Sequence, residues 1–539
     1  METNYSGLIV DPVNRRSFNG IIVIQNGRIL EIRETNEASD RTILPGFVDA
    51  HIHIESSMLV PSEFARLAVG HGTVATVSDP HEIANVCGIE GVEYMIRNGS
   101  SVPLKFFFGA PSCVPATTFE TAGARLGVED VKELLSRDEI LYLAEMMNWP
   151  GVLFDDPEVT AKIAAAHAAG KPVDGHAPGL KGEKALKYAS AGITTDHECY
   201  TREEALDKLN AGMLIAIREG SAAKNYDTLI PLFRGYPDKI MFCSDDKHPD
   251  DLIRGHMNEI ALRSLALGYD LYDILHALCV LPVRHYGLPV GLLQPGDPAD
   301  FIVVENSRSM IVKETWIDGE KVYDNGTVLF PETEAGRINR FYSYTLSPDD
   351  FRLFSGKADQ EVIVARDGEL ITGRETVTLP LSEGEVLPLP DQDILKIAVV
   401  NRYEEQRPAV GFIKNFGLKN GAIASSVGHD SHNIIVVGSS DEYLARAVNL
   451  IMKEKGGISA VTGEREDVLG LPVGGIMSDA PGEVVAAGYE RLSRLSREMG
   501  SSLKAPFMLI SFMALLVIPS LKMSDKGLFD GESFQFVEQ

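Results

Sequence analysis

The sequence predicts an α/β protein built on a (β/α)8 TIM-like barrel. Between residues 46 and 284, short apolar segments alternate with amphipathic, helix-like stretches. Eight alternations in about 240 residues match the usual size of this barrel. Histidines and carboxylates follow many of the apolar segments, which is where such a barrel carries its active site. A doubly wound open sheet is the structural rival, but no GxGxxG motif follows an early strand.

The apolar segments that we interpret as barrel strands share a length of a few residues and a polar ending. They lie at residues 43–53, 72–79, 105–111, 141–148, 172–176, 194–198, 213–219 and 240–246. The intervening stretches have helical spacing of apolar residues. Examples lie at residues 61–70, 157–170 and 203–212.

Short β-like runs flank the barrel on both sides. Within residues 1–45, the Asn26-Gly27 pair between two such runs is a strong hairpin signal. Similar runs return between residues 300 and 323. Neither flank can bury a core by itself. We therefore expect one small composite β domain, formed by residues 1–45 and 285–335, on a barrel of residues 46–284.

Residues 340–539 are expected to form a separate C-terminal α/β domain. β-like runs precede the polar segment Gly-His-Asp-Ser-His-Asn at residues 428–433, and a helix-like stretch follows at 441–455. The one long apolar run, at residues 507–518, is shorter than the roughly 20 residues needed to span a bilayer. We expect it to be a buried core element.

Composition excludes several classes of function. Lys and Arg number 50 against 77 Asp and Glu, a formal net charge of −27, which disfavours partners such as nucleic acids and anionic membranes. The five cysteines are scattered without a CxxC pair, which indicates a reducing compartment and no thiolate zinc site. The N-terminus has no signal-like segment. We expect a cytoplasmic protein that forms a homodimer or a higher homo-oligomer.

A His-x-His motif ends the first predicted barrel strand, in Pro-Gly-Phe-Val-Asp-Ala-His-Ile-His. Residues two apart on a strand point the same way, so His51 and His53 present two imidazoles to one side. Two imidazoles make half of a divalent metal site. The motif alone is weak evidence, because many such pairs are surface or core histidines.

Other strand ends complete the set of ligands. Six nitrogen and oxygen ligands would meet at the mouth of the barrel: His51, His53, Glu145, His176, His197 and Asp245. Six ligands suffice for two divalent ions that share a bridging water. Glu145 is the candidate for the bridging carboxylate, and Asp245 would also carry a proton from water to the leaving group. Without thiolates, this ligand set leaves Mn²⁺, Fe²⁺ and Zn²⁺ all possible.

His81 and Glu82 follow the second predicted strand in Asp-Pro-His-Glu. Their place at a strand end leaves three roles open. They could contact the substrate, hold an auxiliary metal or cap the next helix.

Several motifs resemble the adenine deaminase family of the amidohydrolase superfamily. They are LPGFVDAHIHIESSM, TVATVSDPHEIANVCG, LAEMMNWPGV, DGHAPGL, TDHE and GHDSHN, and the run GLLQPGDPADFIVV is typical of the superfamily. The resemblance extends essentially from end to end. Many superfamily members bridge their metals with a modified lysine on the fourth strand. The resemblance implies that Glu145 stands in that position here.

The resemblance implies an adenine aminohydrolase, which adds water to C6 of adenine and releases ammonia and hypoxanthine in purine salvage. Attack on an aromatic ring needs a strong nucleophile and an acid that protonates the ring. Glu198, Glu82 and Asp245 are candidates for that acid, and the sequence does not rank them. The chain lacks the P-C-x-x-C pair of the other zinc deaminase design.

The polar segment at residues 428–433 has two interpretations. Its spacing alone favours a solvated turn. The family resemblance instead suggests that His429, Asp430 and His432 reach the barrel mouth, to close over the substrate or bind an accessory metal. The segment at residues 474–478 is a weaker candidate for a second such turn.

Two other functions remain open at the level of sequence. One is another binuclear metal amidohydrolase, acting on a cyclic amide or a related purine. The other is a non-catalytic scaffold that has lost its metals, although such a protein would have no reason to keep all six ligand residues.

Overall fold

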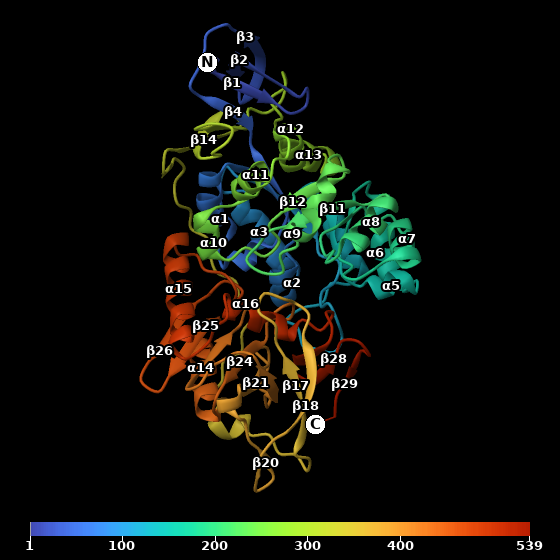
Figure 1. Ribbon diagram of the computed structural model, residues 1–539, viewed down its shortest axis with the longest axis vertical. Helices are drawn as coiled ribbons and strands as arrows, with labels where there is room; N and C mark the ends of the chain where they lie inside the picture. Colours follow the sequence, from blue (N-terminus) through green and yellow to red (C-terminus); the bar gives the residue numbers. More distant parts are fainter. Residues whose placement is uncertain (1, 539) are drawn as a thin grey trace.

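The computed structural model describes residues 2–538, and three units follow one another along its long axis (Figure 1). A small β-sheet that contains the N-terminal strands lies at one end, a barrel lies in the middle, and a C-terminal α/β unit lies at the other end. The expected fold class is confirmed. The domain boundaries named above stay predictions.

The small sheet joins both flanks of the barrel. Its strand order is β16-β15-β14-β13-β4-β1-β2-β3. The strands are β1 (Glu2–Asp11), β2 (Arg16–Gln25), β3 (Arg28–Glu34), β4 (Thr42–Pro45), β13 (Phe301–Val304), β14 (Val312–Ile317), β15 (Glu320–Asp324) and β16 (Thr327–Val328). Asn26 and Gly27 both have positive φ, 51° and 78°, as a two-residue hairpin turn requires.

The apolar segment predicted as one strand at residues 43–53 forms two strands, divided at Gly46, the residue at which the predicted barrel begins. Residues before Gly46 form β4 of the small sheet, and residues after it form the first barrel strand, β5. A Cβ at Gly46 would lie 2.3 Å from Val74 Cγ1. The chain therefore passes from one sheet to the other at a point where only glycine fits.

Eight parallel strands form the barrel. They are β5 (Phe47–Ile52), β6 (Thr73–Ser78), β7 (Lys105–Ala110), β8 (Ile140–Met146), β9 (Val173–Gly175), β10 (Thr195–Asp196), β11 (Leu214–Arg218) and β12 (Ile240–Cys243). Parallel bridges close the ring, between Val173 and Ile193 on one side and between Ile52 and Asp245 on the other. The strands are buried along most of their length, as barrel strands covered by helices should be.

Helices cover the outside of the barrel. They are α1 (Pro61–Ala68), α2 (His81–Cys87), α3 (Ile89–Gly99), α4 (Val128–Leu135), α5 (Trp149–Leu153), α6 (Pro157–Ala168), α7 (Gly182–Ser190), α8 (Arg202–Asn210), α9 (Tyr226–Leu229), α10 (Pro249–Arg254), α11 (Met257–Ala266), α12 (Leu271–Leu275) and α13 (Leu281–Tyr286). At least one helix follows each strand, so the predicted alternation is confirmed.

The C-terminal unit is built on a second eight-stranded sheet, of order β18-β17-β22-β21-β24-β23-β25-β26. Its strands are β17 (Asp359–Val364), β18 (Gly373–Thr378), β21 (Ile394–Val400), β22 (Ala409–Lys414), β23 (Gly421–Ser425), β24 (Ile434–Gly438), β25 (Gly457–Thr462) and β26 (Glu466–Gly470). Short hairpins accompany it, formed by β19 (Leu381–Ser382) with β20 (Glu385–Val386) and by β27 (Leu521–Ser524), β28 (Gly527–Asp530) and β29 (Gln535–Phe536).

Alternating side chains give this sheet two buried faces. Ala398 and Val400 of β21 pack toward helix α14 (Asp441–Glu454). Ile397 and Val399 belong instead to the core that is continuous with the barrel. Helices α15 (Gly482–Glu498) and α16 (Pro506–Ser511) fill that second side. The sheet is thus buried on both faces, and one face is turned toward the barrel.

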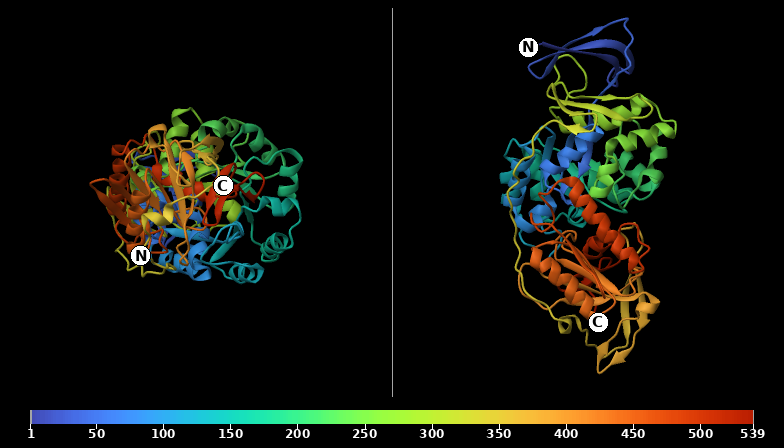
Figure 2. Two further views of the ribbon diagram at one scale, coloured as in Figure 1. Left: turned by 90° about the horizontal axis from the view of Figure 1, so that it is seen from below. Right: turned by 90° about the vertical axis from the view of Figure 1, so that its left-hand side faces the viewer.

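Residues 329–347 connect the small sheet to the C-terminal unit and contain no helix or strand. Figure 2 shows this yellow segment running along the outside of the barrel. The apolar run at residues 507–518 is largely buried, in α16 and the turns after it. Among residues 2–538, no helix combines the length and apolarity needed to cross a membrane.

Candidate metal centre

Histidines from the first barrel strand begin the centre. His51 lies on β5 and His53 directly follows it, and their Nε2 atoms are 3.3 Å apart. The two rings are nearly perpendicular, at 85°. Both side chains are buried, at 2% and 4% exposure. The strand geometry expected from the His-x-His motif is therefore present.

Glu145 lies at the centre of the group and faces a different histidine set with each oxygen. Its Oε2 is 2.9 Å from His176 Nδ1 and 3.0 Å from His197 Nε2. Its Oε1 is 3.6 Å from His53 Nε2. One carboxylate thus lies between two groups of imidazoles, as a shared ligand of two ions would.

Asp245 completes the first-strand side of the centre. Its Oδ1 is 3.4 Å from His51 Nε2 and 3.3 Å from His53 Nε2. The backbone NH of Asp245 donates to His51 O, and its own carbonyl accepts from the NH of His53. The bonds that close the barrel therefore also fix this carboxylate beside the histidine pair.

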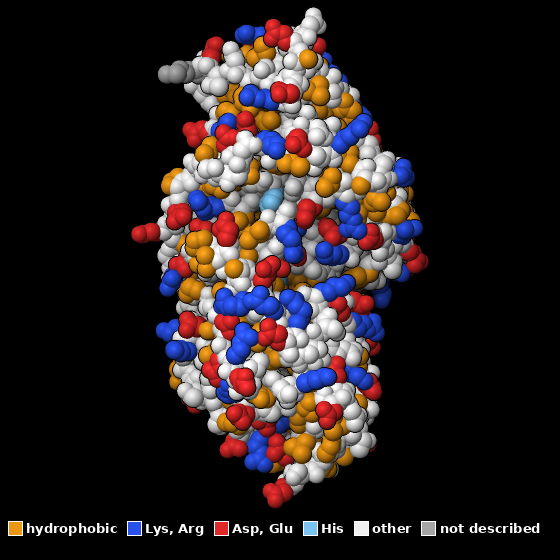
Figure 3. Space-filling model, turned by 60° about the vertical axis from the view of Figure 1, so that its left-hand side comes forward, with side chains coloured by type: hydrophobic (Ala, Val, Ile, Leu, Met, Phe, Trp, Pro, Cys, Tyr) orange, Lys and Arg blue, Asp and Glu red, His pale blue; other side chains and the backbone are white. Residues whose placement is uncertain are grey.

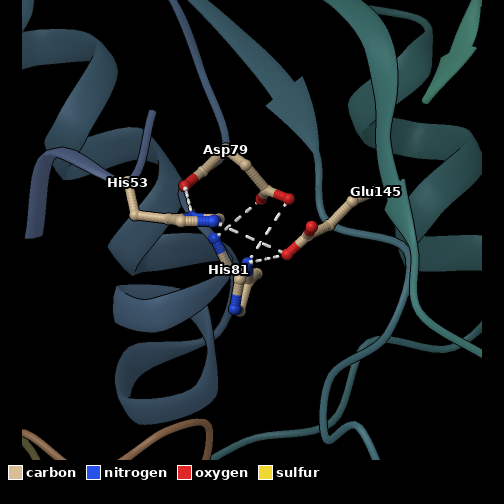
Figure 4. A group of neighbouring side chains, drawn as sticks. All are labelled: His53, Asp79, His81 and Glu145. Carbon is tan, nitrogen blue, oxygen red and sulfur yellow. Dashed lines mark hydrogen bonds and ion pairs between the residues drawn. The ribbon is translucent and has the colours of Figure 1, made fainter. Parts of the chain in front are cut away.

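His81 adds a seventh ligand-type side chain to the group. Its Nδ1 is 3.3 Å from Asp79 Oδ2 and 3.5 Å from Glu145 Oε1. Figure 4 shows that nitrogen turned toward Asp79 and Glu145, while the other ring nitrogen points away from them. His81 is the first residue of α2, so the same residue begins a helix and faces the metal-ligand group.

The residues present fit the metal ions that the ligand pattern implies. All six predicted ligands belong to groups whose candidate ligand atoms lie within 4.8 Å of one another. The Nε2 atom of His176 is buried without a hydrogen-bond partner. Leaving such atoms unsatisfied costs free energy, which a bound cation would remove. With only nitrogen and oxygen donors, the set suits Mn²⁺, Fe²⁺ or Zn²⁺.

Electrostatics agree with a site built for positive charge. Burial opposes ionisation of Glu145, but His176 and the other imidazoles outweigh it and lower the pKa of Glu145 well below its usual range. Burial likewise opposes the charged form of His176, yet the carboxylates of Glu145 and Glu198 raise its pKa to about 9. The Glu145 carboxyl therefore stays ionised at neutral pH, as a carboxylate ligand of a metal must be.

Arg218 is a site residue to which the sequence alone assigned no role, although it ends a predicted barrel strand. It ends β11 and is 1% exposed. Its Nη1 donates to Asp245 Oδ2 at 2.6 Å and to Glu198 Oε1. Its Nε donates to Ala223 O at 2.8 Å. Its position at the end of a barrel strand was the available signal, because that is where such folds place functional side chains.

Asp49 is a second residue to which the sequence assigned no role. Its carboxylate accepts hydrogen bonds from groups next to the ligands. It accepts hydrogen bonds from Ser244 N at 3.0 Å and from His51 N at 3.3 Å. Its Oδ2 also pairs with His256 Nε2 at 2.8 Å. Asp49 therefore ties the ends of β5 and β12, which carry His51 and Asp245.

The segment at residues 428–433 reaches the barrel mouth. It connects β23 to β24 and lies against Glu82 of α2. Glu82 Oε1 pairs with His429 Nδ1, and Glu82 Oε2 lies 2.5 Å from His432 Nε2. Burial opposes ionisation of Glu82, but His429 and His432 lower its pKa well below the usual value. The solvated-turn interpretation is therefore wrong, because this segment is buried between two units.

The pocket above the metal ligands has walls from both units. It is a small cavity of about 30 Å³. Its lining residues are His53, His81, Glu82, Glu145, Met147, His176, Glu198, Arg218, Asp245, Asp246, Leu370, His429, Asp430, Phe512 and Leu515. Barrel residues supply most of the polar lining, and the C-terminal unit supplies three apolar side chains, Leu370, Phe512 and Leu515, together with His429 and Asp430.

The second candidate turn, at residues 474–478, also contacts the barrel through its backbone. Ser478 N donates to Met58 O at 2.8 Å, and Val60 N donates to Ser478 O at 3.1 Å. Arg402 donates to Gly474 O at 2.6 Å from within the C-terminal unit. This turn therefore joins the two units beside the helix that follows the His-x-His strand.

Comparison with known proteins shows which family the chain belongs to. The model of the Amidohydrolase family matches residues 42–322, and that of the Adenine deaminase C-terminal domain matches residues 369–535. An adenine deaminase from Salinibacter ruber is 55% identical over 536 residues, 99% of this chain and 98% of that protein. The chain belongs to the adenine deaminase family. Another adenine deaminase, from Methanosarcina mazei, is 50% identical and covers 99% of both chains.

Membership of the adenine deaminase family confirms the resemblance inferred from the motifs. The two matched regions meet at the pocket. Residues of the amidohydrolase part supply the metal-ligand candidates, and residues of the adenine deaminase C-terminal part supply His429, Asp430 and Phe512.

Proposed function

We propose that the protein is an adenine deaminase, which hydrolyses adenine to hypoxanthine and ammonia. The observation that carries the proposal is a pocket shared by a metal-type barrel centre and the adenine deaminase C-terminal domain. Relatives named adenine deaminase, at 46–55% identity, match nearly the whole chain. The reaction is hydrolysis of a C–N bond in a cyclic amidine.

Two divalent ions would be held by the six residues that converge on the barrel mouth. His51, His53 and Asp245 face one position, and His176 and His197 face the other. Glu145 would be shared between them, because its Oε1 lies 3.6 Å from His53 Nε2 and its Oε2 lies 3.0 Å from His197 Nε2. When bound, the ions would lower the pKa of water and so supply the nucleophile at neutral pH.

Two protons must move for the reaction to balance. Water adds its oxygen to C6 and the C6–N6 bond breaks, so one proton goes to the ring nitrogen N1 and one to the departing amino group. Glu198 and Asp245 both line the pocket. We assign Glu198 to carry the proton to N1 and Asp245 to carry the proton to the amino group. Each carboxylate would accept its proton from water before donating it.

Arg218 supports this assignment by its contacts with both carboxylates. Burial opposes ionisation of Glu198 and Asp245, but Arg218 and neighbouring imidazoles lower the pKa of each carboxyl. Both groups are therefore ready to accept a proton in the resting enzyme. Glu82 is a poorer candidate for the acid, because His429 and His432 face its two oxygens. We assign Glu82 to holding the 428–433 segment.

Finer properties complete the proposal. We propose Mn²⁺ as the native metal and purine salvage as the physiological role. All five cysteines are unpaired and buried, which supports a reducing, cytoplasmic location. Phe154 beside α5 and Leu186 of α7 are 83% and 57% exposed. Exposed apolar side chains on neighbouring helices support a homodimer or higher homo-oligomer, which light scattering after gel filtration would test.

Adenine turnover by the manganese-loaded protein tests the function directly. We expect the ultraviolet absorbance of adenine to fall as hypoxanthine forms, with one ammonia released for each adenine consumed. Turnover of a cyclic amide without turnover of adenine would replace the proposal with the other amidohydrolase function. Fewer than about one bound ion per chain, together with no turnover, would favour the non-catalytic scaffold.

Glu145→Gln tests the shared-ligand role. The substitution keeps the size of the side chain but removes its charge, so both metal positions lose a ligand. We expect turnover to fall by several orders of magnitude and bound metal to fall below two ions per chain. Metal content by mass spectrometry and adenine kinetics on one preparation measure both effects. Retention of both ions in the variant would rule out sharing.

A further inference from the structure

A second group of ligand-type atoms lies where the start of α2 meets the C-terminal unit. His81, Glu82 and Asp430 bring a ring nitrogen and two carboxylates within 4.8 Å of one another. The three side chains are 3%, 1% and 3% exposed. Two of them come from the barrel and one from the 428–433 segment, so the group spans the junction between units.

The distances within this group are close to those between ligands that share one metal ion. His81 Nε2 is 3.6 Å from Glu82 Oε1 and 3.7 Å from Asp430 Oδ1. Both separations are too long for direct hydrogen bonds. Ligands bound at about 2.0–2.2 Å around one tetrahedral ion lie about 3.3–3.6 Å apart. In the barrel centre, His53 Nε2 lies at similar distances, 3.3–3.6 Å, from its carboxylate neighbours.

Asp430 lacks a partner that would justify its burial. Its Oδ2 is buried without a hydrogen bond, and its Oδ1 lies 3.7 Å from His81 Nε2. Burial, and then the charge of Asp430, raise the pKa of the neighbouring Glu120 carboxyl, so that neighbour supplies no positive charge to Asp430. A buried carboxylate without close compensation is costly. A cation among His81, Glu82 and Asp430 would remove that cost.

The group is separate from the barrel centre, although His81 touches both. His81 Nδ1 faces Asp79 and Glu145, and Nε2 faces Glu82 and Asp430. Figure 4 shows the second nitrogen directed away from the barrel carboxylates. The two ring nitrogens of one imidazole therefore serve two different groups.

We propose that His81, Glu82 and Asp430 bind a third divalent cation, which ties the C-terminal domain to the barrel. One imidazole and two carboxylates suit Mn²⁺, Fe²⁺ or Zn²⁺. His429 and His432 would hold Glu82 in place from the loop side rather than bind the ion. Backbone Gly428 N donates to His432 Nδ1, so a neutral His432 carries its proton on Nε2, toward Glu82. The proposal does not depend on the identity of the substrate.

Metal counting on the full chain tests the proposal. Protein expressed in manganese-supplemented medium and passed through gel filtration should hold three ions per chain. Asp430→Asn should hold two. Asp525→Asn is the matched control: Asp525 is also buried at this junction, but it binds Thr121 N and Asn401 Nδ2 outside the group. The control should keep three ions. Asp430→Asn should also lose the increase in Tm that added Mn²⁺ gives the wild type.

Replacing Asp430 with cysteine, a softer ligand, distinguishes loss of the third ion from general destabilisation of the protein. Asp430→Cys should lose the third Mn²⁺ but retain a third Zn²⁺, because thiolates favour Zn²⁺ over Mn²⁺. Two ions in the wild type, three in Asp430→Asn, or equal Mn²⁺ and Zn²⁺ content in Asp430→Cys would each overturn the proposal. If a two-ion wild type still deaminates adenine, the third site fails while the proposed function stands.

Discussion

At the scale of single residues, Arg218 keeps the carboxylates of the two proposed proton carriers ionised and in position. Its guanidinium contacts Glu198 and Asp245 from the end of β11, and all three side chains are buried. Without it, two carboxylates would face each other in a site of low dielectric. Arg218 is therefore a positioning residue for both.

Replacing Arg218 tests this role. Arg218→Met should lower kcat for adenine at least about 100-fold and cost about 3–5 kcal/mol of unfolding free energy, because it leaves buried charges unpaired. Arg218→Lys keeps the charge but loses the Nε bond to Ala223 O and the Nη2 contact with Glu198, so an intermediate kcat is expected. Steady-state kinetics and denaturant unfolding measure the two effects.

Arg402→Lys is the control for Arg218. Arg402 is as buried, but its hydrogen bonds go to Asn339 and to backbone carbonyls, among them Gly474 O. It should lose stability and keep kcat within a few-fold. An Arg218→Lys enzyme with unchanged kcat would contradict the positioning role.

Lys522 makes stability depend on pH. It is fully buried and donates to Leu370 O at 2.6 Å and Phe512 O at 2.9 Å. Burial lowers the pKa of its amine from 10.5 to about 7. Between pH 7 and about 10.5 the unfolded chain therefore binds more protons at this lysine than the folded chain, so unfolding free energy rises with pH there.

Lys522→Met should remove that slope. From pH 6.5 to 9, the Tm of the wild type should rise relative to the Tm of the variant, because only the wild type releases the buried charge. Thermal melts at matched ionic strength measure the difference. Parallel Tm–pH curves for the two proteins would contradict a lowered pKa for Lys522.

At the scale of elements, Gly46 separates two sheets that share one stretch of chain. β4 pairs with β1 and β13 in the small sheet, and β5 pairs with β6 in the barrel. The apolar pattern runs through both strands without a break, so hydrophobicity alone predicts one strand. The close approach of Val74 marks the division.

Gly46→Ala should therefore destabilise the fold by about 1–3 kcal/mol, the usual cost of overpacking a core. Val74→Ala in the same chain should restore part of that loss, because it removes the atoms that the new Cβ meets. Unfolding free energies of the two single variants and the double variant give the coupling. Strictly additive effects would show that the clash with Val74 is not the cause.

At the scale of the whole molecule, the pocket exists only where two domains meet. Figure 3 shows many Lys and Arg side chains at the waist between the barrel and the C-terminal unit, on the face drawn. Within the junction, Glu82 contacts His429 and His432 of the C-terminal unit. The C-terminal domain therefore forms part of the candidate active site as well as its own core.

His432→Ala should weaken this junction without touching the barrel ligands. Losing a hydrogen bond to a charged group costs about 1.5–3 kcal/mol, so KM for adenine should rise about 10–100-fold, or turnover should be lost. Both barrel ions should remain bound. The matched control is His167→Ala, on the exposed side of α6. Kinetics like those of the control would show that the 428–433 segment has no part in the site.

Sequence by itself determined the features that depend on short stretches of backbone. The direction of His51 and His53 follows from the two-residue repeat of a strand, and the eightfold rhythm follows from local apolar periodicity. Motifs around Glu145 and His176 indicated the family, because ligand residues are carried by strand ends whose local sequence is distinctive. None of these features needs knowledge of a distant partner.

Only the tertiary structure decided which charged groups, distant in the sequence, lie next to one another. Arg218 meets Glu198 and Asp245, and Glu82 meets His429 and His432, only after the barrel closes and the C-terminal domain docks. A buried charge is stabilised by whatever lies a few ångströms away, and that neighbour depends on packing rather than on sequence distance. The same dependence gives Gly46 its role, since Val74 reaches it only across the sheet.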